Sequence, residues 1–218
     1  MISAVVHGNN ADLIQNVCAL HLREGDTIAD VTYGKGVFWR KMPDADVTGS
    51  DLITVPERPY DFRNLPYADN QFDIAVLDPP YIHSPGQHVT DSRYQNKATT
   101  RGMLHADIRQ LYVDGMRECA RIARRQVWVK CKDQVQSGLQ RWAHCEMLAD
   151  ALSLGLFGRD LFILLAQSQT PSGRWKVQHH ARKPHSYLWV FEHPSKSNQA
   201  QLKRERIFQS LTKENASD

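Results

Sequence analysis

Short apolar runs alternate with amphipathic segments along most of the chain. Continuous apolar runs predict buried strands at 27–32, 46–50, 72–77, 126–131, 161–166 and 186–192. Apolar residues at helical spacing predict helices at 12–22, 37–41, 107–123 and 142–155. Because strands and helices alternate, we expect one doubly wound α/β domain with a largely parallel sheet covered on both faces.

Two long polar stretches, residues 82–105 and 168–185, interrupt this alternation. Long irregular segments inside a compact domain are usually functional. Both stretches mix aromatic residues with basic ones, among them Arg93, Arg101, Arg174, Lys176 and Arg182. This mixture suits contacts to a phosphate backbone and exposed bases, although a solvated loop has the same composition. We expect a single domain over residues 1–193 and a polar tail over 194–218.

Composition narrows the class of protein. The 218 residues are 41% hydrophobic and 23% charged, as in an ordinary globular domain. No apolar stretch predicts a membrane span, and the first residues lack the pattern of a secretory signal. The four cysteines are too scattered for a disulfide framework or a zinc site. These features predict a cytoplasmic protein without a metal, and a net charge of +3 does not by itself indicate a polyanionic partner.

A glycine-rich turn, residues 30–36 (DVTYGKG), directly follows the first predicted strand. Such a turn lets backbone N–H groups approach a ligand closely. It lacks the third glycine of a dinucleotide fingerprint and the Gly-Lys-Ser/Thr ending of a P-loop, which disfavours a nucleoside triphosphate. Asp51, after the second strand, is placed to accept both hydroxyls of a ribose. An ordinary tight turn with two capping aspartates, Asp30 and Asp51, is the alternative.

The tetrapeptide Asp78-Pro79-Pro80-Tyr81 follows the strand at 72–77 and is more specific. Two prolines fix the backbone just beyond a buried strand, where open α/β sheets place their ligands. The Asp78 carboxylate and the Pro79 carbonyl can accept the two hydrogens of an exocyclic amine, and the Tyr81 ring can stack on the base. A plain turn with a packed tyrosine is the alternative.

These two motifs resemble those of the amino-group methyltransferases that use S-adenosylmethionine, particularly the DNA adenine-N6 and cytosine-N4 enzymes. The resemblance covers most of residues 5–193. It implies a Rossmann-like class I methyltransferase fold with a seven-stranded, mostly parallel sheet, and S-adenosyl-L-methionine as the cofactor. It assigns the methionine portion of the cofactor to Asp30, Tyr33, Gly34 and Gly36, the ribose to Asp51, and the adenine ring to Asp61 and Phe62. Segment 7–12 sits where several members place a further contact, but a polar helix entry has the same residue types.

The resemblance also implies the chemistry. Asp78, Pro79, Pro80 and Tyr81 would form the catalytic turn, and a flipped base would bind beside it. Only 42 residues separate Gly36 from Asp78, so recognition elements are expected later, near 82–105 and 168–185. The expected substrate contacts are Tyr81, Arg93, Arg101, Arg174, Lys176 and Arg182. At the end of strand 126–131, Lys130 and Asp133 are expected to be structural, although either can face the substrate.

Several functions stay open. The favoured one is methyl transfer to adenine N6 in DNA by a monomer or homodimer, because Asp at the first motif position leans towards adenine by family analogy. Transfer to cytosine N4, or to a base amine in RNA, uses the same motifs. A non-catalytic nucleic-acid-binding module and a methyltransferase of small molecules or proteins are further alternatives.

Overall fold

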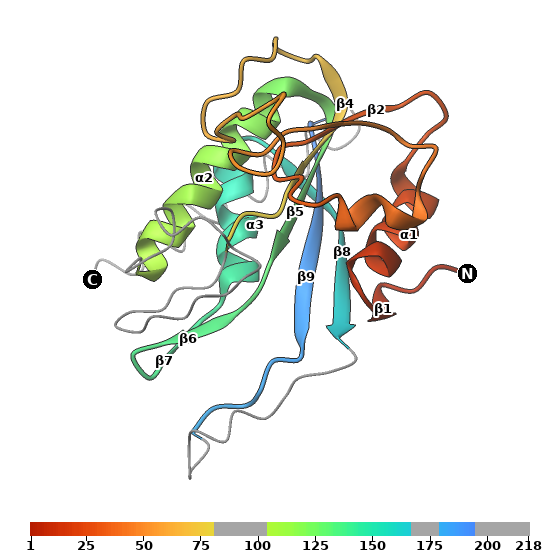
Figure 1. Ribbon diagram of the computed structural model, residues 1–218. Helices are drawn as coiled ribbons and strands as arrows, with labels where there is room; N and C mark the ends of the chain where they lie inside the picture. The colour runs from red at the N-terminus through yellow and green to blue at the C-terminus, as the bar shows by residue number, and fades with distance from the viewer. Residues whose placement is uncertain (81–103, 167–178, 195–218) are drawn as a thin grey trace.

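The computed structural model describes residues 1–80, 104–166 and 179–194 (Figure 1). Its seven-stranded sheet has the strand order β1-β8-β9-β5-β4-β2-β3. Every neighbouring pair is parallel except the two that β9 makes with β5 and β8. The predicted α/β class and the mostly parallel, seven-stranded sheet are therefore confirmed. The strands are β1 (Val5–Gly8), β2 (Thr27–Asp30), β3 (Asp46–Gly49), β4 (Phe72–Leu77), β5 (Ala123–Cys131), β8 (Phe157–Ala166) and β9 (His185–Glu192).

Helices cover both faces of the sheet (Figure 1). Helix α1 (Asn10–His21) and the short 3-10 helix η1 (Val37–Lys41) pack on one face. Helices α2 (His105–Ile122) and α3 (Ala143–Ser153) pack on the other. Because successive side chains of a strand point to opposite faces, Ile28 belongs to the core under α1 and Ala29 to the core under α2.

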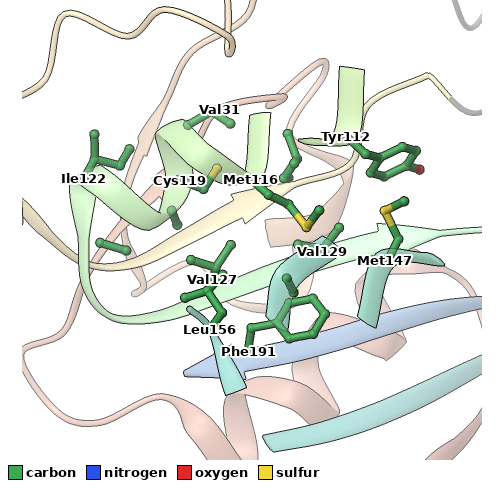
Figure 2. Packing of buried hydrophobic residues seen from close by; sticks show 14 of the residues in the cluster. Val31, Tyr112, Met116, Cys119, Ile122, Val127, Val129, Met147, Leu156 and Phe191 are labelled. Carbon is green, nitrogen blue, oxygen red and sulfur yellow. The ribbon is translucent and has the colours of Figure 1, made fainter. Parts of the chain in front are cut away.

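The core under α2 is almost entirely apolar. Met116 and Cys119 of α2 and Met147 of α3 pack onto Val127 and Val129 of β5 (Figure 2). All five side chains are buried. This layer holds α2 and α3 against the middle strands of the sheet.

Helix α1 begins with a capping box. The Asn9 side chain accepts hydrogen bonds from the backbone N–H groups of Ala11 (2.9 Å) and Asp12 (3.3 Å). In return, the Asp12 carboxylate accepts one from the backbone N–H of Asn9 at 2.9 Å. The polar residues of segment 7–12 thus form a helix entry, one of the two interpretations that the sequence left open.

Three local elements differ from the sequence-based expectation. Strand β1 was not predicted, because only Val6 of its four residues is buried and the strand is defined by its pairing with β8. The hairpin of β6 (Gln134–Gln136) and β7 (Leu139–Arg141) was also missed, since its residues are mostly polar. Strand β8 begins at Phe157, before the expected residue 161, because a register shift between Gly158 and Asp160 carries polar residues within the strand.

Within the described ranges, no helix is both long enough and apolar enough to cross a membrane. The predicted polar tail lies beyond the described residues apart from its first residue, Pro194.

Candidate active site

The two sequence motifs meet at the carboxyl edge of the sheet. Strands β2 and β4 are parallel neighbours, and the backbone N–H of Val31 donates to the carbonyl of Val76 at 3.1 Å just beyond β2. The backbone N–H of Asp78 donates to Oγ1 of Thr32 at 2.7 Å. The glycine turn and the Asp78-Pro79-Pro80 turn are therefore hydrogen-bonded to each other. Ligands of open α/β sheets bind at this edge.

The glycine turn needs its glycines. Gly34 (φ +56°) and Gly36 (φ +63°) both have left-handed backbone conformations, which side chains with a Cβ rarely adopt. The Tyr33 ring lies over Gly36 and over Gly49 at the end of β3. A Cβ on Gly49 would lie only 2.5 Å from that ring. Three predicted cofactor residues, Tyr33, Gly34 and Gly36, thus lie together beside the end of β3.

Asp30 has intramolecular partners on this turn. Its side chain is buried and accepts hydrogen bonds from Nε1 of Trp39 at 2.7 Å and from the backbone N–H of Thr32 at 3.1 Å. Burial raises the pKa of Asp30 to about 7, against these two hydrogen bonds and with the charges of Asp78 and Asp51 adding to the rise. The Asp30 carboxyl group therefore links the glycine turn, at Thr32, to the 3-10 helix that follows it, at Trp39.

Asp51 and Asp61 also bind backbone or side-chain groups of their own loops. Oδ1 of Asp51 accepts from the backbone N–H groups of Ile53 (2.9 Å) and Thr54 (2.8 Å) just after β3. The Asp61 carboxylate binds the guanidinium of Arg63 through three contacts of 2.5–3.1 Å. That guanidinium lowers the pKa of Asp61. Asp51 thus caps the loop that follows β3, and Asp61 is engaged by Arg63; their assignments to the ribose and the adenine ring stay predictions.

Phe62 packs against the apolar face of the sheet. It lies so close to α2 that a Cβ on Gly115 would be 2.9 Å from its ring and 3.0 Å from Leu77. The absence of a side chain at Gly115 therefore makes room for Phe62 next to the residue that precedes Asp78. Phe62 is only partly buried there, and its assignment to the adenine ring stays a prediction.

Asp78 has a charged neighbour. Its Oδ1 is buried, and Nζ of Lys130 on β5 lies 3.5 Å from it. The Asp78 side chain is 20% exposed, whereas that of Lys130 is 3% exposed. Burial raises the pKa of Asp78, and the charge of Lys130 opposes that rise. Pro79 is buried and Pro80 half-buried, and Tyr81 lies outside the described residues.

A polar network lies just beyond the end of β5. The buried carboxylate of Asp133 lies 2.8 Å from Nδ1 of His144 and accepts a hydrogen bond from the Tyr187 hydroxyl at 3.4 Å. The His144 and Tyr187 rings are stacked, with their centroids 4.3 Å apart. Asp133 therefore contacts side chains of α3 and β9.

The predicted substrate contacts are only partly described. Tyr81, Arg93, Arg101, Arg174 and Lys176 lie outside the described residues. Arg182 is exposed on the segment that enters β9. That segment contacts the β6–β7 hairpin, where Nε2 of His180 lies 3.0 Å from the carbonyl oxygen of Gly138.

The residues that sequence reasoning missed are the partners of the two aspartates. Thr32 accepts a hydrogen bond from the backbone of Asp78, and Trp39 donates one to the side chain of Asp30. Lys130, the charged neighbour of Asp78, was named in the sequence analysis only as a residue that can face the substrate. One signal was available for Lys130, because a lysine inside a strand of buried residues needs a charged partner. Trp39 carried no comparable signal, since an apolar packing role explains it equally well.

No protein-family model and no curated protein matches the sequence. Several solved structures are similar to the fold of this chain. The magnesium protoporphyrin IX methyltransferase of Synechocystis PCC 6803, solved with bound S-adenosylmethionine, is 12% identical with a TM-score of 0.53, over 85% of this chain and 78% of that one. The [4+2]-cyclase SpnF is 16% identical with a TM-score of 0.51, over 84% and 80%.

A third similar structure is a protein of Thermus thermophilus named as a DNA modification methylase, solved with S-adenosyl-L-methionine. It is 14% identical with a TM-score of 0.40, over 78% of this chain and 56% of that one. The present chain thus spans little more than half of that protein's length. These identities establish an arrangement of elements rather than an activity. The chain has the Rossmann-like class I methyltransferase fold.

Proposed function

We propose that this protein transfers a methyl group from S-adenosylmethionine to the exocyclic amino nitrogen, N6, of adenine in DNA. The observation that carries the proposal is the hydrogen bond from the Asp78 N–H to Thr32 Oγ1. It joins the turn that we assign to the cofactor to the turn that we assign to the amine, at one edge of the sheet.

The residues at this edge fit the cofactor. The left-handed conformations of Gly34 and Gly36 leave the turn without side chains at the points where backbone N–H groups approach a ligand. Tyr33 lines the same side, and Asp51 stands at the end of β3 for the ribose hydroxyls. The buried carboxyl of Asp30 favours a cationic ligand nearby. When bound, S-adenosylmethionine supplies an electrophilic methyl on a sulfonium.

The Asp78-Pro79-Pro80-Tyr81 turn would contribute to catalysis by orienting the substrate amine. The Asp78 carboxylate and the Pro79 carbonyl accept the two amine hydrogens, which directs the nitrogen lone pair towards the methyl group. The nitrogen–methyl bond would form as the methyl–sulfur bond breaks, which would leave a neutral thioether and a positive charge on the nitrogen. The Asp78 carboxylate would stabilise that charge until the amine releases one proton. An adenine amine needs no prior deprotonation for this attack. Tyr81 would stack on the flipped base, and the basic segments near 82–105 and 168–185 would contact the phosphates.

The test is transfer of labelled methyl to unmethylated DNA and to RNA, followed by nucleoside analysis. We expect label in N6-methyladenine from DNA, and no detectable label with Asp78→Ala. Asp44→Ala is the matched control, because Asp44 is exposed on the loop before β3 and lies outside the proposed site. Full turnover in Asp78→Ala would overturn the assignment of Asp78. Label only in N4-methylcytosine would show that the acceptor is cytosine, and label only in RNA would show that the substrate is RNA.

A further inference from the structure

Lys130 is a buried charge that the proposed reaction does not use. Its side chain is 3% exposed, and its Nζ lies 3.5 Å from Oδ1 of Asp78. The same ammonium group lies 5.9 Å from the centroid of the Phe38 ring, within the range of a cation–π contact. A buried ammonium group is strongly unfavourable unless it is paired, so this arrangement must be compensated by its neighbours.

The strand pattern places Lys130 and Asp78 on the same face of the sheet. Trp128 of β5 and Val76 of β4 belong to the core under α1, and Lys130 and Asp78 follow them by two residues. Successive side chains alternate between faces, so residues two apart share a face. The pair therefore lies on the α1 side of the catalytic edge.

Three groups bear on the charge of Asp78 from the elements around it. Lys130 of β5 is the favourable one. The charge of Asp78 raises the pKa of Asp30 of β2 and of the Cys131 thiol of β5, so an ionised Asp30 opposes the ionised form of Asp78, whereas the thiol is neutral. Thr32 contributes a neutral hydroxyl that accepts from the Asp78 backbone. Lys130 is thus the cation that offsets burial and the neighbouring acid.

We propose that Lys130 is a positioning residue that keeps Asp78 an anion and holds its Oδ1, leaving the other carboxylate oxygen for the substrate amine. Oδ1 is the buried oxygen, so the exposed part of the Asp78 side chain belongs to its remaining atoms. This inference rests on the proposed function, because it assigns a role to the partner of the proposed catalytic carboxylate.

The chemical consequence follows from what a protonated Asp78 would do. A neutral carboxyl group cannot stabilise the positive charge that develops on the amine nitrogen, and its O–H competes with the amine hydrogens as a donor. An opposite charge within about 4–6 Å favours the ionised form of a carboxyl group. Lys130 therefore widens the pH range over which Asp78 can orient an amine.

The test compares Lys130→Met, which keeps an unbranched side chain one atom shorter and without the charge, with Lys130→Arg, which keeps the charge. Methyl transfer is measured against pH in the full chain. For Lys130→Met we expect the rising limb of the profile to move to higher pH by about one to three units, so that the loss is largest in acid and smallest in alkali. Lys130→Arg should restore the wild-type midpoint. An equal loss at every pH in both variants would overturn the proposal.

A second readout does not depend on activity. The ¹³C resonance of the Asp78 carboxyl group, assigned by its absence in Asp78→Asn, reports the titration of that group directly. We expect its midpoint to rise in Lys130→Met and to return in Lys130→Arg. An unchanged midpoint would overturn the inference. If the wild-type protein methylates no nucleic acid, the proposed function fails while this titration still decides the coupling of Lys130 to Asp78.

A third comparison tests the proposal if the Lys130→Met protein does not fold. In that case the double variant Asp78→Asn/Lys130→Met, which removes both members of the pair, should recover the fold, because no unpaired buried charge remains. A double variant that is as unstable as the single one would show that Lys130 acts through packing alone.

Discussion

The two faces of the sheet differ most where they reach the carboxyl edge. On the α2 side the ends of β2 and β4 are apolar, with Leu77 and Phe62 packed against Gly115, whereas Asp133 beyond β5 is a buried acid. On the α1 side the same strands end in Asp30, Asp78 and Lys130, all largely removed from solvent. At the ends of β2 and β4 one face is therefore apolar, whereas the other carries charges that the fold must tolerate. Charges of this kind are typical of functional sites.

The largest effect should come from the apolar face. Phe191 of β9 is fully buried in the core under α2 (Figure 2), and Phe191→Ala is expected to lower the free energy of unfolding by about 3–5 kcal/mol. Chemical denaturation measures this change. Leu139→Ala is the control, because Leu139 is exposed on the β6–β7 hairpin and should change stability little. Equal effects of the two substitutions would contradict the contrast between core and surface.

On the charged face we expect the free energy of unfolding to depend on pH through Asp30. The pKa of Asp30 is about 7 in the fold against 3.8 for an unperturbed carboxyl group, so the folded state retains its proton more tightly. The stability from this group is complete below about pH 4 and is lost as pH rises through about 7. The difference between the two pKa values corresponds to at most about 4 kcal/mol.

Asp30→Asn isolates this dependence. The difference in unfolding free energy between wild type and variant should change in favour of the variant as pH rises from about 4 to about 8. Chemical denaturation at a series of pH values measures it, with Asp44→Asn as the control at an exposed position. A wild-type minus variant difference that stays constant with pH would show that Asp30 remains ionised throughout.

A smaller effect should sharpen the description of the apolar face. In Gly115→Ala the new Cβ would press on Phe62 and Leu77, which costs about 1–3 kcal/mol, while the helix propensity of alanine offsets up to about 1 kcal/mol. We expect a net loss of about 1 kcal/mol in chemical denaturation. Phe62→Leu in the same chain should recover part of it. A more stable Gly115→Ala protein would mean that Phe62 is loosely packed.

The sequence predicted the features that depend on residues close together along the chain, namely the strands and the turns that follow them. The strands that lead into the glycine turn and into Asp78 carry continuous apolar runs, and the turns carry glycine or proline, so both could be placed at the sheet edge. The partners of Asp30 and Asp78 could not be predicted, because Trp39 and Lys130 reach them through the pairing of β2, β4 and β5. The position of Phe62 opposite Gly115 could not be predicted for the same reason, and its assignment as an adenine contact stays a prediction.

The hydrogen bond between Thr32 and Asp78 joins residues 46 positions apart, with β3 lying between them in the sequence. Contacts of this kind form only after a long loop has closed. A fragment of this chain that stops before β4, or begins after Gly36, holds one of the two turns and none of the contact between them. The candidate site is thus a product of the assembled sheet, and it is expected to disappear in the same cooperative step in which β2 and β4 separate.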